Sequence, residues 1–208
     1  MPVELLIQGA LSGFAIAAPV GPINVLCIRR TLANGFGLGL ASGLGAAVAD
    51  TLFGAVAAFG VASVMTFLAR WEGVLCLLGG IVLVLLGCRG LVSGPPTDDG
   101  QGDGSVGLLG AFVSTFGMTI VNPMTVLSFL AVFAAVGIGA LGIGAATILV
   151  AGVFLGSAAW WLGLSGVVTA IRHALSERTL VWINRGAAFA ILAFGAWALV
   201  RAAQILWI

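Results

Sequence analysis

The sequence predicts an all-α, polytopic membrane protein with six transmembrane helices. Hydrophobic residues make up 61% of its 208 residues and charged residues only 7%, whereas a soluble domain is about 45–50% apolar and about 25% charged. Long apolar runs replace the alternating pattern of a membrane barrel. The net charge of +1 excludes a nucleic-acid-binding protein, and the high hydrophobicity excludes a disordered chain.

The gaps between charged residues define the helices. The gap from Asp103 to Arg172 is too long for one span of about 20 residues and suits two spans with a Gly-rich turn between them. Residues 31–69 contain one charge, Asp50, and they predict one long span preceded by a short loop at 34–37. The six predicted helices are 5–28, 38–68, 73–92, 107–135, 140–168 and 183–206.

The arginines predict the orientation in the membrane. The loops after the first, third and fifth predicted helices carry six arginines, and the opposite side carries Arg70 and Arg201. By the positive-inside rule the arginine-rich loops are cytoplasmic, so both termini are expected in the periplasm. Residues 1–20 lack the basic start of a signal peptide, so no cleavage is expected. The six arginines are Arg29, Arg30, Arg89, Arg172, Arg178 and Arg185.

The chain divides into two similar halves within one membrane domain. Residues 93–106 form a Gly-, Pro- and Asp-rich segment, which predicts a cytoplasmic linker between a first repeat at 1–92 and a second at 107–208. At an offset of 101 residues, Pro22 falls on Pro123. Because each half has three helices, the second half is expected to insert upside down, as in the inverted repeats of many secondary transporters.

Prolines inside apolar spans predict a helix break in each half. Proline removes a backbone hydrogen bond and clashes with the preceding turn. The half-helix that starts at such a break presents free N–H groups and a positive dipole end, which suit an anionic carboxylate. The alternative is a packing kink at which polar side chains only satisfy the freed backbone. The predicted substrate-binding residues at the two breaks are Pro19, Gly21, Pro22, Asn24, Asn122, Pro123 and Thr125.

Asp50 is the candidate for coupling. A charge at mid-membrane costs about 2.5–3.5 kcal/mol on insertion scales, so the carboxyl group either pairs with a cation or carries a proton. Two functional roles follow: binding the ammonium group of a zwitterionic substrate, or carrying the proton that drives transport. The alternative is a structural carboxylate that accepts hydrogen bonds from Asn24, Asn122 or Thr119.

Other residues have simpler interpretations. Arg29 and Arg30 are expected to be interfacial anchors, with a role in binding the substrate carboxylate as the alternative. Trp160 and Trp161 either shape a cavity or contact lipid and core. Three GxxxG spacings predict close helix packing and leave a homo-oligomer open. They start at Gly9, Gly39 and Gly152.

Several classes of chemistry are not expected. The three cysteines form no CxxC motif, the chain has one histidine, and there is no lysine to complete a phosphate-binding loop. We therefore expect no enzymatic activity, no cofactor and no resident metal. The energy for transport must come from an ion gradient or from the gradient of the substrate itself.

Together these features resemble the lysine exporter (LysE) family of bacterial amino-acid translocators, including its homoserine/threonine-resistance branch. The family motif is usually a compact Pro-Gly-Pro followed by Asn; here Val20 and Ile23 intervene, as in a variant branch. The resemblance implies six helices in two inverted halves, and export of amino acids or their derivatives in exchange for protons across the bacterial inner membrane. The segments that carry it are 19–24, Gly35, Gly39, 43–46, 49–50 and 119–125.

The sequence therefore predicts a secondary exporter that works by alternating access. Its partners would be a small zwitterionic amino acid, protons and the lipid bilayer. Two other functions stay open: a cation exporter for divalent metal ions, and a non-transporting membrane scaffold.

Overall fold

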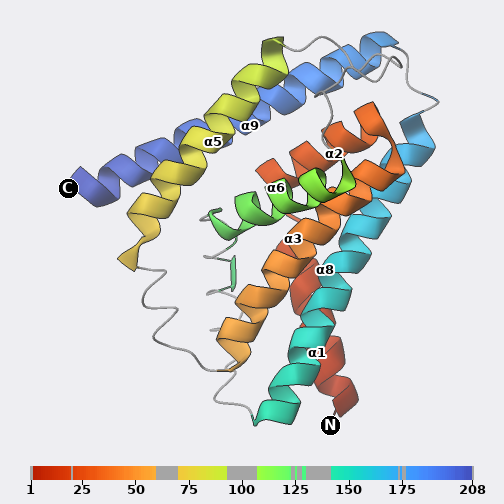
Figure 1. The fold of residues 1–208 in the computed structure, drawn as a ribbon, viewed down its shortest axis with the longest axis vertical. Coiled ribbons are helices and arrows are strands. Elements are labelled where there is room, and N and C mark those ends of the chain that lie inside the picture. Colours follow the sequence, from red (N-terminus) through yellow and green to blue (C-terminus); the bar gives the residue numbers. More distant parts are fainter. Residues whose placement is uncertain are drawn as a thin grey trace.

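In the computed structural model, the residues whose structure is described are helical with short connections and include no β-strand (Figure 1). They are residues 2–19, 21–59, 70–92, 107–122, 125, 128–129, 142–172, 174 and 177–207. The prediction of an all-α protein is confirmed for these residues. The helices are α1 (Pro2–Ala17), α2 (Pro22–Asn34), α3 (Phe36–Ala58), α5 (Glu72–Val92), α6 (Leu108–Ile120), α8 (Ile143–Arg172) and α9 (Glu177–Trp207).

Four of these helices are long and apolar enough to cross a membrane: α3, α5, α8 and α9. A fifth span arises if α1 and α2, which meet at an angle of 80°, are counted together. Helix α6 is apolar but has only 13 residues. Most of the rest of the predicted 107–135 helix, like the 93–106 linker, lies outside the described residues. The full count of six spans stays a prediction.

Several predicted boundaries are corrected. The predicted helix 5–28 is two helices, and the second continues to Asn34. The predicted loop at 34–37 shrinks to Gly35, whose φ of 84° is in the left-handed region that glycine tolerates. The Gly35 N–H closes the last turn of α2 by donating to Thr31 O. Helix α9 begins at Glu177, so Arg178 and Arg185 belong to a helix and not to the polar loop expected there.

Helices α1 and α8 lie side by side, with their backbones in contact. A Cβ atom on Gly13 would collide with the carbonyl oxygen of Val153, and one on Gly156 with that of Ala10. The GxxxG spacings that start at Gly9 and Gly152 therefore face each other. Such contact lets van der Waals attraction and close helix approach stabilise the pair where no hydrophobic effect operates between helices.

Helix α3 lies at the centre of the described helices and contacts α2, α6 and α8. Helices α5 and α9 form a separate pair, in yellow and blue at the upper left of Figure 1. This pair meets α2 at a cluster made by Val25, Leu83 and Ile191. The main buried cluster lies beside the break between α1 and α2 and includes Ala17, Ile23, Cys27, Ala46, Ala47 and Trp161.

Arg30 joins α2 to α3 and to α6 in the second half. Its side chain is only 8% exposed, so the expectation of an interfacial anchor is wrong for this residue. The guanidinium donates to Ser42 Oγ at 3.0 Å, Thr115 Oγ1 at 2.8 Å and Ser114 Oγ at 2.9 Å. It also donates to Ala111 O at 3.1 Å. The planar fork of arginine suits such a cluster of oxygen acceptors, because it presents five N–H donors in fixed directions.

Replacing Gly156 by Ala should separate α1 from α8. The added Cβ meets backbone that cannot move without shifting the whole helix, so we expect the free energy of unfolding to fall by about 1–3 kcal/mol. Gly163→Ala is the matched control on α8, since its Cβ would meet nothing within 4 Å. Thermal unfolding in detergent measures both variants. Equal stability of the two variants would contradict the close backbone contact between α1 and α8.

Arg30→Met should destabilise the protein, whereas Arg29→Met should have a smaller effect. The first change removes charge-assisted hydrogen bonds to two other helices, and we expect a loss of about 2 kcal/mol in the free energy of unfolding. Arg29 is the neighbouring, less buried arginine of the same helix. Denaturant titration of the purified variants makes the comparison. A larger loss for Arg29→Met would contradict the assignment of Arg30 as the cross-link.

Candidate functional site

The first predicted break is present between α1 and α2. Helix α1 ends at Ala17, and α2 begins at Pro22 with Gly21 as an extended N-cap at φ −127° and ψ −178°. Proline is favoured at the first position of a helix, because its missing N–H would have no partner there and its φ already fits. Pro22 thus starts a new helix at 80° to the old one, and the prediction that residues 19–24 break the helix is confirmed.

Asn24 satisfies the backbone that this break sets free. Its Nδ2 donates to Ala17 O at 3.1 Å and to Pro19 O at 2.9 Å. Its Oδ1 accepts a hydrogen bond from Trp160 Nε1 at 2.9 Å. The side-chain amide therefore joins the end of α1, the start of α2 and the middle of α8. This is the structural role considered for Asn24, and it leaves the residue beside the pocket described below.

In the second half, helix α6 ends where the second break is predicted. The helix ends at Ile120, and the Asn122 N–H donates to Thr119 O at 3.2 Å. The Thr125 N–H then donates to Asn122 O at 3.1 Å. Asn122 is the position that corresponds to Gly21 at the offset of 101 residues, and it is buried. The predicted site residue Pro123 lies outside the described residues.

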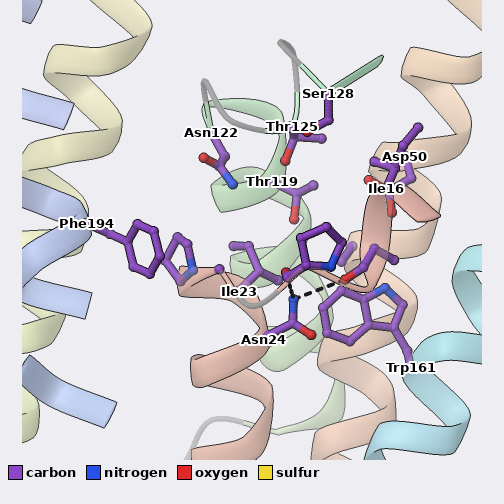
Figure 2. Close-up of a pocket in the computed structure, with 15 residues that line it drawn as sticks. Ile16, Ile23, Asn24, Asp50, Thr119, Asn122, Thr125, Ser128, Trp161 and Phe194 are labelled. Carbon is purple, nitrogen blue, oxygen red and sulfur yellow. Dashed lines mark hydrogen bonds between the residues drawn. The ribbon is translucent and has the colours of Figure 1, made fainter. Parts of the chain in front are cut away.

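The two breaks meet at one pocket of about 90 Å³ (Figure 2). A water molecule needs about 10–15 Å³ of such space, so the pocket suits a group of several heavy atoms. The structure brings Pro19, Gly21, Pro22, Asn24, Asp50, Asn122 and Thr125 together at this pocket. Its other lining residues, which the sequence did not single out as a binding set, are Ile16, Ala17, Ile23, Ala46, Thr119, Ser128, Trp161 and Phe194.

Asp50 lines this pocket from α3 and is 3% exposed. Its Oδ2 accepts a hydrogen bond of 2.6 Å from Ser157 Oγ of α8. Ser157 Oγ in turn accepts a hydrogen bond of 3.2 Å from Trp161 Nε1. Asn24, Asn122 and Thr119 were the partners considered for a structural carboxylate, and the partner in the structure is Ser157 instead. The reason is geometric: α8 packs along α3 and presents Ser157 to Asp50, although 107 residues separate the two in the chain.

The neighbouring tryptophans of α8 have different surroundings. Trp161 lines the pocket and is buried. Trp160 donates to Asn24 and packs edge-to-face on Phe14, with ring centroids 5.4 Å apart. Their roles as pocket wall and as packing residue, left open by the sequence, are thus divided between the two.

Two residues of the site carried weak signals in the sequence. Ser157 is a polar residue inside an apolar helix, one turn before Trp161. Ser128 falls on Cys27 at the offset of 101 residues. Neither signal names a partner, because hydroxyl groups in apolar helices often bond their own backbone, as Thr119 does to Thr115 O.

The pocket has two ends of opposite electrostatic character. Asp50 supplies a carboxyl group, and it is the one ionisable side chain among the described lining residues. The start of α2 supplies a positive dipole end, and no side chain caps it. A carboxylate group fits the helix terminus and an ammonium group fits Asp50. Within the described parts of the chain, no three His, Cys, Asp or Glu residues come together to hold a metal ion.

Comparison with known proteins identifies the family to which this chain belongs. No solved structure is significantly similar to this chain. A protein of Bacillus subtilis (strain 168) named "Putative amino acid efflux protein YcgF" is 28% identical over 189 residues, which cover 88% of this chain and 89% of that protein. The sequence profile of the LysE type translocators matches residues 14–202, a range that includes both breaks and Asp50. The chain belongs to the LysE type translocator family.

Proposed function

We propose that this protein is a secondary transporter that exports amino acids or their derivatives across the bacterial inner membrane in exchange for protons. The observation that carries the proposal is the pocket in which the two helix breaks meet Asp50. Membership of a translocator family and similarity to a protein named for amino-acid efflux support the substrate class. An intramembrane carboxyl group is a functional site by default, because its burial is costly.

The substrate carboxylate would bind at the start of α2. The first backbone bond of this helix runs from the Val25 N–H to Gly21 O at 3.1 Å. The N–H groups of Ile23 and Asn24 come before it and have no partner within the helix. Both residues line the pocket, and the positive end of the helix dipole lies at the same helix start. An anion placed there gains hydrogen bonds that no side chain already occupies.

The substrate ammonium would bind at Asp50. A protonated Asp50 is neutral and has no electrostatic attraction for a cation, whereas the ionised carboxylate attracts it strongly in a low-dielectric pocket. Binding the ammonium group and binding the proton thus exclude each other. A carrier that reorients only with one of them bound exchanges the amino acid for a proton.

The packing of the described helices supports the inverted repeat that alternating access requires. Successive glycines of α1 face successive residues of α8, so these two helices run parallel. Gly37 faces Leu108 and Gly45 faces Phe112, so α3 and α6 also run parallel. Exchanging the two halves converts one pair into the other, since α1 corresponds to α6 and α3 to α8. Such symmetry lets one chain open to either side of the membrane.

Asp50→Asn should abolish proton-driven accumulation. Asparagine keeps the size of the side chain but neither carries the transported proton nor attracts ammonium. Purified wild type and variant are compared in proteoliposomes with an imposed proton gradient and a labelled panel of neutral and basic amino acids. We expect the wild type to accumulate at least one member of the panel and the variant to fall to the level of empty vesicles.

The matched control is Glu72→Gln, which removes an exposed ion pair with Arg201 outside the pocket. This variant should accumulate the same amino acid as the wild type does, because exposed ion pairs contribute little. Loss of accumulation with retained amino-acid exchange in Asp50→Asn would assign the proton but not the ammonium to Asp50. If the wild type and both variants are folded but none of them accumulates any amino acid of the panel, the proposed substrate class is contradicted.

The proposed orientation has its own test. In a cysteine-free background, Val3→Cys should react with a membrane-impermeant maleimide added to intact cells, and Gln101→Cys should react only after permeabilisation. Three spans would place these positions on opposite sides of the membrane, with the arginine-rich side in the cytoplasm. The opposite labelling pattern would reverse the orientation. Equal labelling of both positions in intact cells would contradict three spans in the first half.

A further inference from the structure

The side chain of a bound amino acid needs a place of its own in the pocket. The sites proposed for the substrate carboxylate and ammonium are the start of α2 and Asp50. Figure 2 shows Asp50 and Phe194 at opposite sides of the pocket, with Ile23 and Asn24 between them in this view. The carboxylate and ammonium groups of an amino acid share one carbon atom. A substrate held by both therefore has its side chain left to extend toward Phe194.

Phe194 is the described lining residue that α9 contributes, and its ring is held from behind. It packs on the buried cluster of Val25, Leu83 and Ile191, where the α5–α9 pair meets α2. A ring that packs in a dense apolar cluster cannot swing aside without disturbing its neighbours. Phe194 therefore forms a fixed wall at this end of the pocket.

The described surroundings of Phe194 are uncharged. A small second pocket adjoins the first, and Ile23 and Asn122 are among the residues that line both. None of the described residues that line this second pocket is ionisable. Along α9 the nearest charged residues to Phe194 are Arg185 and Arg201, nine and seven positions away, which corresponds to roughly 10–14 Å of helix. A charge placed beside Phe194 would thus leave water without gaining a partner of opposite sign.

We propose that Phe194 closes the end of the pocket that receives the substrate side chain, and that it restricts the exported amino acids to those with short, uncharged side chains. A charged side chain is excluded because burial of an unpaired charge is costly. A long side chain is excluded because it meets the Phe194 ring. This inference rests on the proposed amino-acid transport and adds the class of side chain to it.

The volume of the pocket agrees with a short side chain. A space of about 90 Å³ holds roughly six to nine non-hydrogen atoms, if each needs about as much space as one water molecule. The ammonium group, the α-carbon and the carboxylate take up most of that space. The pocket wall from the second half includes the hydroxyl and amide groups of Thr119, Asn122 and Thr125, so uncharged polar side chains fit as well as apolar ones.

The limit on length is tested with an unbranched series of uncharged amino acids: alanine, 2-aminobutyrate, norvaline and norleucine. Exchange across proteoliposomes gives kcat/KM for each member. Phe194→Ala should raise the ratio of kcat/KM for norleucine to that for alanine at least about tenfold, because one methylene group in an apolar pocket changes such a ratio about 10–200-fold. Phe194→Trp should lower the same ratio, because the larger ring shortens the space for the side chain.

The matched control is Phe189→Ala, since Phe189 is an exposed phenylalanine of the same helix. Its ratio should equal that of the wild type. Thermal unfolding checks that each variant is folded, because Phe194→Ala removes packing from the cluster on α2. Phe194→Leu keeps most of this packing and should raise the ratio in the same direction. An unchanged ratio in the folded Phe194 variants would overturn the role of Phe194.

The limit on charge is tested with pairs of equal size, norvaline against 2,4-diaminobutyrate and asparagine against aspartate. Each is added at pH 7 as a competitor of the amino acid that the wild type exchanges fastest. The charged member of each pair should inhibit at least about a hundredfold more weakly than the uncharged member, because its side chain must lose its water. Equal inhibition within the pairs would overturn the restriction to uncharged side chains.

These outcomes separate the inference from the function on which it rests. Exchange of amino acids by the wild type supports the proposed transport, whichever length is preferred. Exchange with the same ratio of kcat/KM in the wild type and in all folded Phe194 variants overturns the role of Phe194 and leaves the transport standing. If the folded wild type exchanges none of the amino acids, both proposals are overturned.

Discussion

The need to satisfy backbone groups freed inside an apolar protein governs this structure. Between Ala17 and Pro22 the chain turns by 80°, and a membrane interior offers no water to the carbonyls left open there. Asn24 bonds two of these carbonyls and is itself held by Trp160 of α8. One amide group therefore fixes the angle between α1 and α2, joins the break to the second half of the chain, and leaves the start of α2 open to the pocket.

Polar groups of the interior are divided between a structural and a chemical task. Arg30 lies six residues beyond Asn24 on α2 and cross-links three helices through oxygens of Ser42, Ser114 and Thr115. Asp50 accepts a hydrogen bond from Ser157 at one carboxyl oxygen and lines the pocket. The guanidinium of Arg30 is thus held by oxygens of the protein, whereas the carboxyl group of Asp50 lies at the pocket.

Glycine allows this arrangement because it lets helix backbones approach closely. The contact of α1 with α8 brings the break within reach of Trp160, and α3 lies close to both α6 and α8. The pocket forms where these contacts converge. Its lining combines residues from both halves of the chain, so relative movement of the halves would change its access. This dependence on two halves is what an alternating-access carrier requires.

The helical class and the break at residues 19–24 followed from the sequence, and so did the choice of Asp50 as a candidate site residue, because each depends on a local property. Apolar runs demand helices in a bilayer, proline lacks an N–H, and a mid-membrane carboxyl group is costly wherever its helix packs. The count of six spans, the orientation and the roles of the site residues stay predictions. Only the tertiary structure paired Asp50 with Ser157, buried Arg30 and separated the tasks of Trp160 and Trp161. Such pairings depend on how helices rotate and cross, and no single helix encodes its partner's face.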